Sequence, residues 1–278
     1  GVGHLYRAAA ISKAMIAVGL DVHIVSGGVP VPWLDFGDAN IHQLTPIKCR
    51  AGDFKDLITK DGQSLDDDIR NRRRDDLLAI LDKVSPDAVI IEAFPFGRRQ
   101  MRFELLPLLA ACQKRIPEPK VICSVRDILQ MSDKPGRVDE IVDTLSTHFD
   151  HVLVHGDPVL IPFDQTFPQT SSIAEAIAYT GIVVDKPGGI SAEGHGDVLI
   201  SAGGGATQSE VLLEAALNAY EHSSAKDRHW RLMAGPNLPD GEFERLTARA
   251  PGGISVERNR SDFKSLLSVC GVSVSQAG

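Results

Sequence analysis

The hydrophobic positions along the chain follow two patterns that alternate. From His4 to Val18 the apolar residues recur at steps of three and four, which predicts a helix with one buried face. Residues 21–26 are rich in β-branched side chains and predict a strand that ends at a glycine turn. Residues 87–92 form a nearly continuous apolar run, which is typical of parallel strands that are covered on both faces.

Both patterns repeat through the N-terminal part of the chain. Helices are predicted at 68–84, 102–115 and 138–146, and further strands at 41–44, 120–124 and 151–155. Because strands and helices alternate, the sequence predicts the α/β class with parallel sheets. The basic run at 70–74 is flanked by aspartates, and we interpret it as a solvated helix face.

A polar, turn-rich segment at 183–196 interrupts the alternation and predicts a linker between two domains. Beyond it, strands are predicted at 197–202, 231–234, 254–257 and 272–275, and a helix at 207–222. With 278 residues the chain is long enough for two domains. We therefore expect Rossmann-like domains with parallel sheets at 1–182 and 197–278.

Each predicted domain lacks a part at one end of the sequence. The turn Gly1-Val2-Gly3-His4 normally follows the first strand of such a unit, and here no strand stands before it. At the other end, a glycine turn follows strand 272–275 without a further helix. We expect a fragment lacking both termini, in which the first domain misses its first strand and the second is incomplete.

Composition narrows the class of protein. Hydrophobic residues make up 43% and charged residues 24%, which is normal for a folded globular protein. The net charge of -8 disfavours a nucleic-acid partner, because phosphate binding needs a basic surface. The four cysteines form no C-x-x-C pair, which is typical of a cytoplasmic protein without disulfides. No apolar run is long enough to span a membrane, peripheral membrane contact is not indicated, and the oligomeric state stays open.

Three consecutive glycines stand between the predicted strand 197–202 and the helix 207–222. Glycine lets the backbone approach a ligand closely, and Thr207 and Glu210 have capping-box spacing. The amide groups and dipole of a helix end attract anions. The predicted diphosphate-binding residues are Gly203, Gly204, Gly205, Ala206 and Thr207. The alternative is a tight turn without a ligand.

Other ligands are disfavoured. Neither glycine loop has the third glycine of a dinucleotide fingerprint, because Gln208 and Tyr6 occupy that position, so nicotinamide chemistry is not expected. His148, His151 and His155 are close in sequence, but no convergent carboxylates accompany them. We therefore expect neither a metal site nor a cofactor.

Ligands of parallel sheets bind at the carboxyl ends of the strands, where His4 is expected. A histidine there can act as a general base near neutral pH, and the alternative is a helix-end hydrogen bond. Arg7, one turn further on, is either a phosphate contact or a surface charge. Candidate acceptor-side residues are Gly1, Gly3, Arg7, Glu92, Arg98 and Arg99. The two arginines at 98 and 99 would bind an anionic acceptor or, alternatively, form a solvated turn.

Four segments together resemble the two-domain glycosyltransferases of the GT-B fold, most closely the branch with the MurG-type, family 28-type enzymes. They are GVGHLYRAAAISKAM, EAFPFGRRQMRFELLPLL, LISAGGGATQSEVLLEA and SVSQAG. The resemblance implies that the first domain binds an acceptor and the second a UDP-sugar, without a divalent metal. It places His4 as catalytic base, Gly203 to Thr207 near the donor diphosphate, and Ser275, Gln276 and Gly278 in a second donor loop.

The implied function is transfer of a hexosyl group, such as N-acetylglucosamine, from a UDP-sugar to an acceptor of unknown class. Two alternatives stay open. A UDP-sugar hydrolase of the same fold shares the GxGHxxR start, and there the histidine activates water. A non-catalytic subunit that binds a nucleotide sugar is the other alternative. The sequence identifies neither the acceptor nor the sugar.

Overall fold

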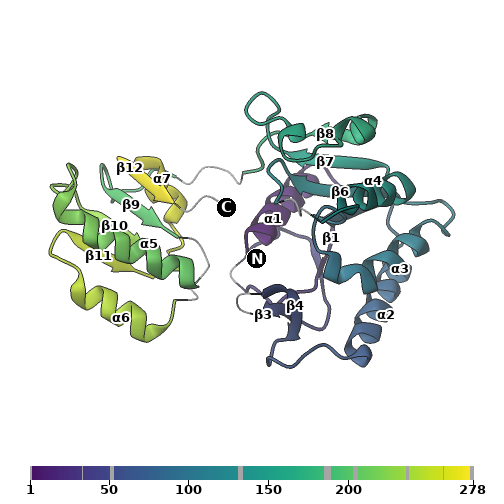
Figure 1. Ribbon diagram of the computed structural model, residues 1–278, viewed down its shortest axis with the longest axis horizontal. Helices are drawn as coiled ribbons and strands as arrows, with labels where there is room; N and C mark the ends of the chain where they lie inside the picture. The colour runs from purple at the N-terminus through teal and green to yellow at the C-terminus, as the bar shows by residue number, and fades with distance from the viewer. Residues whose placement is uncertain are drawn as a thin grey trace. The chain divides into compact units, whose positions relative to one another are not determined.

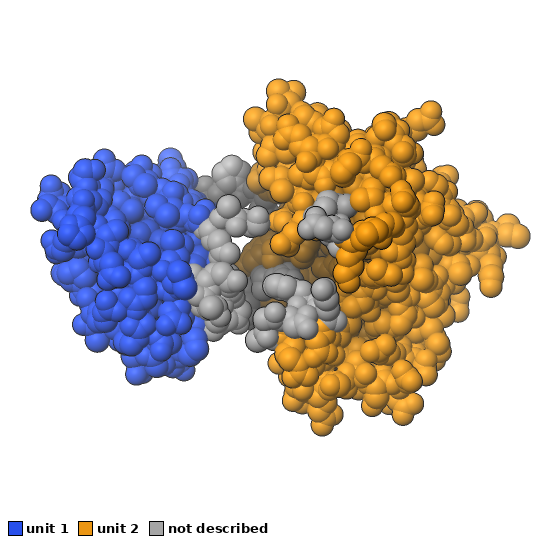
Figure 2. Space-filling model, in the orientation of Figure 1, with its two compact units in different colours: residues 1–2, 185–278 blue, residues 3–184 orange. Residues whose placement is uncertain are grey.

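The computed structural model describes residues 2–32, 34–50, 53–130, 134–184, 189–202, 206–235, 238–258 and 260–275. The chain divides into two compact units (Figure 2). The N-terminal unit comprises residues 3–184, and the C-terminal unit comprises residues 185–278 together with residues 1–2. No helix in the described part of either unit has the length and apolar character that a membrane span requires.

The N-terminal unit contains a sheet of four parallel strands in the order β5-β6-β7-β8 (Figure 1). These are β5 (Ala88–Glu92), β6 (Lys120–Arg126), β7 (His151–His155) and β8 (Ile177–Tyr179). The helices of the unit are α1 (Val2–Ala17), α2 (Asp67–Val84), α3 (Arg102–Cys112) and α4 (Arg137–His148), with short 3-10 helices η1 (Arg99–Met101), η2 (Phe163–Gln165) and η3 (Thr170–Ala176). Alternating strands and helices therefore form a parallel α/β unit, as predicted.

Two buried clusters form the core of this unit. Leu77 and Leu81 of α2 pack with Leu108 and Leu109 of α3 and with Ile91 of β5. The second cluster joins α4 to the sheet; it contains Cys123, Val125, Ile141, Leu145, Val152 and Val154. The charged residues and histidines of these strands stand at the strand ends, whereas Ser124 lies inside β6.

Two smaller sheets complete the unit. Strand β1 (His23–Ser26) pairs in parallel with β2 (Asn40–Gln43), as the sequence predicts. The antiparallel hairpin of β3 (Ile47–Arg50) and β4 (Asp53–Thr59) was not predicted. Its second strand, with the sequence DFKDLIT, mixes charged and apolar residues, so the apolar run that marked the other strands is absent.

One helix face differs from its prediction. Arg73 belongs to the basic run interpreted as solvated, yet it is fully buried. Its Nε and Nη2 donate to the two carboxylate oxygens of Glu104 on α3, both at 2.9 Å. Nη1 donates to the carbonyl oxygens of Gly27, at 3.0 Å, and Thr45. The prediction that this basic run is solvated was wrong for Arg73. The pattern of charges along one helix does not show that a carboxylate of another helix, here Glu104 of α3, faces one of its arginines.

The C-terminal unit has a second parallel sheet of four strands, in the order β11-β10-β9-β12. Its strands are β9 (Val198–Ser201), β10 (Trp230–Met233), β11 (Ile254–Glu257) and β12 (Val272–Ser275). Its helices are α5 (Ala206–Ala219), α6 (Asp240–Arg249), α7 (Phe263–Val269) and the short η4 (Tyr220–His222). Leu213, Leu232 and Leu246 are fully buried at its centre. The strands lie where they were predicted, whereas the short helices α6 and α7 were not.

Candidate active site

Glu92, the last residue of β5, lies at the centre of a polar cluster. His4 Nδ1 is 2.8 Å from Glu92 Oε1, and the Arg7 guanidinium contacts the same oxygen. On the other side, Ser124 Oγ donates to Glu92 Oε2 at 2.7 Å. The structure therefore brings the predicted catalytic residue His4 together with Arg7 and Glu92, two of the acceptor-side candidates.

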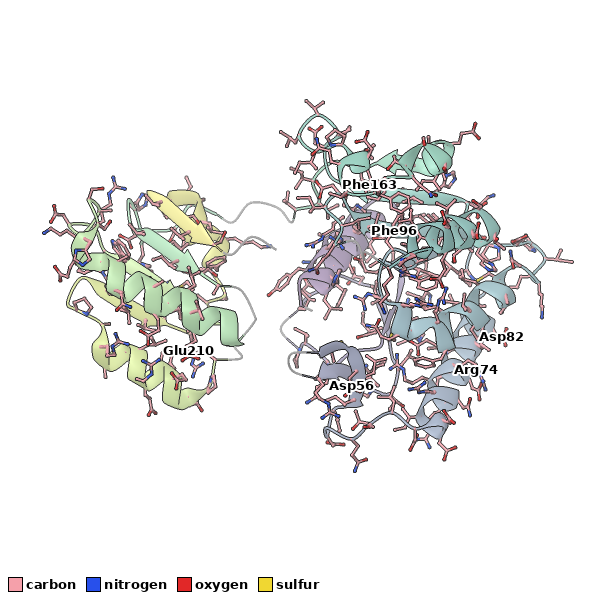
Figure 3. All side chains as sticks on the ribbon, viewed as in Figure 1. Asp56, Arg74, Asp82, Phe96, Phe163 and Glu210 are labelled. Carbon is pink, nitrogen blue, oxygen red and sulfur yellow. The ribbon has the colours of Figure 1, made fainter. Side chains whose placement is uncertain are left out.

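Local sequence explains these positions. The apolar run of β5 ends at Glu92, and the next residue, Ala93, has a left-handed φ of 64° that turns the chain away. Ala93 still donates its N–H to Ser124 O at 2.7 Å. Beyond it, Phe94 and Phe96 are buried in the two core clusters, which fixes the segment that follows Glu92. The ring of Phe96 contacts Phe163 edge-on, with centroids 5.5 Å apart (Figure 3).

The contacts determine which imidazole nitrogen of His4 carries hydrogen. Arg7 Nη2 lies 3.2 Å from the same Nδ1, but a guanidinium can only donate. The carboxylate of Glu92 is closer and is the stronger acceptor, so Nδ1–H donates to Glu92. Nε2 then carries the free lone pair, and it has no hydrogen-bond partner among the described residues. With 37% of its side chain exposed, His4 is also the most accessible of the three.

Glu92 is held as a carboxylate. Burial by itself raises the pKa of Glu92, but hydrogen bonds from His4 and Ser124 and the positive charge of Arg7 lower it to about 2. At neutral pH Glu92 therefore accepts hydrogen bonds and does not exchange protons. A carboxylate in this arrangement can orient the imidazole and can stabilise an imidazolium.

The cluster extends inward to residues that the sequence analysis did not select. His155 Nε2 lies 2.9 Å from Ser124 Oγ, and His155 Nδ1 lies 2.7 Å from Thr180 Oγ1. Burial, together with the charge of Arg7, lowers the pKa of His155. Their position in the sequence could have indicated these two residues. Ser124 and His155 lie at the carboxyl ends of predicted parallel strands, and such ends meet at one edge of a sheet.

The sequence indicates His155 only as part of a weak metal-ligand pattern with His148 and His151. In the described ranges, no group of three or more histidine, cysteine, aspartate or glutamate side chains has an arrangement that could hold a metal ion.

Among the described contacts, none joins Arg98 or Arg99 to this cluster. Arg99 pairs with Glu140 of α4 at 3.5 Å, and the same carboxylate is contacted by Arg102 and, at 3.0 Å, by Arg137. Arg98 has a left-handed φ of 54°, and its buried Nε has no hydrogen-bond partner among the residues described.

The structure shows no contact that explains the two N-terminal glycines, Gly1 and Gly3, as part of a site in the described residues. A Cβ on Gly3 would meet no atom within 4 Å, so no described neighbour requires glycine there. Gly1 lies outside the described residues.

The predicted donor loops belong to the C-terminal unit, and most of their residues lie outside the described ranges. These are Gly203, Gly204, Gly205, Gln276 and Gly278. Ala206 and Thr207 open α5, directly after the first loop. Ser275, which ends β12, is the register partner of Ser201, which ends β9. The two loops thus leave from neighbouring strand ends, where the strand order changes direction.

The side chain of Thr207 lies outside the described residues, so the capping box stays a prediction, and the described contact of Glu210 is with another helix. Glu210, labelled on α5 in Figure 3, lies 3.4 Å from Arg245 of α6. Arg245 also contacts Glu214, so these acidic side chains help to join α5 to α6.

The two α/β units with parallel sheets have the GT-B fold of glycosyltransferases. Among solved structures, the chain is similar to Phytolacca americana UGT2 in complex with UDP-2fluoro-glucose and pterostilbene, with a TM-score of 0.59 and 13% identity over 100% of this chain and 74% of that one. It is also similar to the glycotransferase of kitacinnamycin, with a TM-score of 0.57 and 14% identity over 99% of this chain and 72% of that one. A third similar structure is a UDP-glucosyltransferase from Polygonum tinctorium capable of glucosylating indoxyl, in complex with 3,4-dichloroaniline. Its TM-score is 0.56, with 12% identity over 100% of this chain and 74% of that one.

At this identity the similarity shows the fold, and it does not single out the MurG-type branch that the sequence resembles. A scan against protein-family models found no match. A search of curated proteins also found none.

Proposed function

We propose that the protein is a glycosyltransferase that moves a hexosyl group from a UDP-sugar to an acceptor hydroxyl. The observation that carries this proposal is the contact between His4 Nδ1 and Glu92, which leaves His4 Nε2 free at the carboxyl end of a parallel sheet. The fold supports it, because one solved structure with this fold is a UDP-glucosyltransferase and another is in complex with UDP-2fluoro-glucose. N-acetylglucosamine is one hexosyl group that the sequence resemblance implies, and the panel of donors below identifies the sugar.

In the proposed reaction, His4 Nε2 takes the proton of the acceptor hydroxyl while the acceptor oxygen bonds to the anomeric carbon. The bond between that carbon and the diphosphate oxygen breaks, and UDP leaves with the electron pair. His4 becomes an imidazolium, and the Glu92 carboxylate stabilises its charge. Because the pKa of Glu92 is about 2, the proton stays on His4 until it passes to solvent.

We assign the donor site to the C-terminal unit. Its two glycine-containing loops leave from the paired ends of β9 and β12, and the first leads directly into α5. Amide groups at the start of a helix stabilise the charge that develops on a leaving diphosphate. The proposed donor residues are those at 203–207 together with Ser275, Gln276 and Gly278. We propose no metal or cofactor for this chemistry.

The proposal is tested by product analysis with a panel of UDP-sugars and acceptors. His4→Ala should reduce turnover by about 10²–10⁴-fold, the usual contribution of a general base. His4→Gln should be equally slow, because an amide keeps a hydrogen bond but does not accept a proton. His151→Ala is the matched control, since His151 is an exposed histidine at the opposite end of a strand of the same sheet. Turnover within a few-fold of wild type in both His4 variants would refute a catalytic role for His4.

The same assay separates the alternatives. A transferase needs an acceptor to consume the donor. Release of free sugar without any acceptor would identify a hydrolase, in which His4 activates water. Binding of a UDP-sugar without release of UDP, whatever the acceptor, would identify a non-catalytic subunit.

A further inference from the structure

A chain of hydrogen bonds runs inward from Glu92 through side chains that the proposed chemistry does not use. Ser124 lies beside Glu92, as its register partner on β6. His155 ends β7, and Thr180 follows β8 directly. The successive distances are 2.7 Å from Ser124 to Glu92, 2.9 Å from His155 to Ser124, and 2.7 Å from Thr180 to His155. The four hydrogen-bonded residues thus come from successive strands of one sheet, or in the case of Thr180 from the position just after a strand.

The direction of these hydrogen bonds follows from the groups involved. A carboxylate only accepts, so the single hydroxyl hydrogen of Ser124 is donated to Glu92 Oε2. Ser124 Oγ must then accept from His155, which places a hydrogen on His155 Nε2. The lowered pKa of His155 favours the neutral imidazole, whose Nδ1 then accepts from Thr180 Oγ1. At 2.7 Å this contact is shorter than those of the same hydroxyl with Gly181 O, at 3.1 Å, and Val154 O, at 3.5 Å. Every hydrogen in the chain points toward Glu92.

This polarity distinguishes an anchor from a proton relay. A relay would pass a proton inward from Glu92, but Glu92 is the common acceptor at the end of the chain. Ser124 is 2% exposed and His155 is 7% exposed, so neither is placed to touch a substrate. Their contact with the chemistry therefore passes through Glu92.

Glu92 needs such an anchor because two donors compete for its other oxygen. His4 Nδ1 and the Arg7 guanidinium both contact Oε1. An arginine prefers to bind both oxygens of a carboxylate with its planar fork. The hydrogen bond from Ser124 to Oε2 would be strained or lost if Glu92 rotated into a bidentate pair with Arg7, so it opposes a rotation that would release His4.

We propose that Ser124 and His155 are positioning residues, which fix the Glu92 carboxylate so that His4 is held with hydrogen on Nδ1 and a free Nε2. This inference rests on the proposed function for its kinetic consequence. Its structural consequence, the tautomer of His4, can be measured without any turnover.

The first test uses Ser124→Ala. Loss of a partner that orients a reacting group typically costs 10–100-fold in activity, so kcat should fall about 10–100-fold while KM for the UDP-sugar is unchanged. Ser12→Ala is the matched control: Ser12 is also a buried serine of the N-terminal unit, with its hydroxyl bonded to Phe36 O at 2.9 Å. It should leave kcat within a few-fold of wild type.

A double-mutant cycle shows whether Ser124 acts through His4. Ser124→Ala combined with His4→Ala should be no slower than His4→Ala alone, because the group that Ser124 positions is already absent. A further 10–100-fold loss in the double variant would overturn the proposal, since it would show an effect independent of His4.

A conservative substitution tests His155. His155→Gln keeps an N–H donor near the position of Nε2 and should retain kcat within a few-fold. His155→Leu removes the donor and should be as slow as Ser124→Ala. Equal loss in both variants would refute the role of the Nε2–H donor and indicate a general packing defect.

The tautomer of His4 is measured by ¹⁵N NMR, with the His4→Ala spectrum identifying its signals. Wild type should show hydrogen on Nδ1, and Ser124→Ala should show a mixture of tautomers. An unchanged tautomer in Ser124→Ala would overturn the anchor even if activity falls. If His4→Ala retains full turnover, the proposed function fails, and the tautomer measurement still decides whether Ser124 anchors Glu92.

Discussion

At the scale of the residue, the site depends on one carboxylate that is largely buried and has a hydrogen-bond partner on each oxygen. Glu92 keeps 23% of its side chain exposed, and it receives hydrogen bonds from His4, Arg7 and Ser124. Sequence reasoning could place His4 and Glu92 at the same edge of a sheet. Glu92 is at the carboxyl end of a predicted strand, and His4 begins a predicted helix, which starts at that same edge in an α/β unit. It could not predict the contact with Ser124, since the register between β5 and β6 depends on how their apolar residues pack together in the folded protein.

The pH dependence of stability is one prediction at this scale. The pKa of Glu92 falls from an ordinary value of 4.5 to about 2 in the folded protein. Its ionised form therefore stabilises the fold fully above pH 4.5, and this contribution is lost as the pH falls toward 2. The contribution is about 3 kcal/mol by linkage.

Urea unfolding at pH 7, 5 and 3 measures this contribution when wild type is compared with Glu92→Gln. The variant should be less stable at pH 7, and the difference should shrink toward pH 3, because the amide does not titrate. Subtracting the unfolding free energy of the variant from that of wild type removes the contributions of the other carboxylates, because these titrate in both proteins. A difference that stays constant over this range would show that Glu92 is not held ionised by its partners.

At the scale of the element, buried charge joins helices α2 and α3. Arg73→Met should lower the free energy of unfolding by about 3–5 kcal/mol, because it leaves the Glu104 carboxylate buried without a partner. Arg72→Met, at an exposed position on the same helix, should change it by less than about 0.5 kcal/mol. Denaturant unfolding of the two variants checks the contrast.

The double variant Arg73→Met with Glu104→Leu identifies the cause of that loss. It should recover part of the stability, because no uncompensated charge remains buried. If the double variant is less stable than Arg73→Met alone, the buried Glu104 charge does not account for the loss.

Elements were predictable where the hydrophobic pattern was strong. Long amphipathic helices such as α2 and continuous apolar strands such as β5 and β7 lie close to their predicted limits. The hairpin β3–β4 and the three-residue strand β8 were missed, because their sequences carry little periodicity and their pairing is fixed by neighbours. The helices α6 and α7, with 10 and 7 residues, are shorter than the window of about 11–18 residues over which a helical period is usually read.

At the scale of the whole molecule, the proposal divides the chemistry between the two units. The candidate base lies in the N-terminal unit, and the candidate donor loops leave from paired strand ends of the C-terminal unit. Variants in one unit should therefore change one property and leave the other intact. His4→Ala should reduce turnover and keep UDP affinity.

The complementary prediction concerns Gly204→Val. A branched side chain would occupy space needed by the phosphate oxygens and would disfavour any positive φ, so UDP affinity should fall at least about tenfold while the protein stays folded. UDP at 100 times its dissociation constant stabilises a binding protein by about 2.7 kcal/mol, which a thermal unfolding scan detects. Wild type and His4→Ala should both show this protection, and Gly204→Val should show little.

Gly252→Val is the matched control, because a Cβ on Gly252 would meet no described atom within 4 Å. This glycine belongs to the same C-terminal unit and lies just before β11. The control variant should keep the protection by UDP, which separates a specific effect at the donor loop from a general effect of valine for glycine. If folded Gly204→Val bound UDP as tightly as the control, the diphosphate site would not lie at this loop, and the proposed donor site in the C-terminal unit would lose its main support.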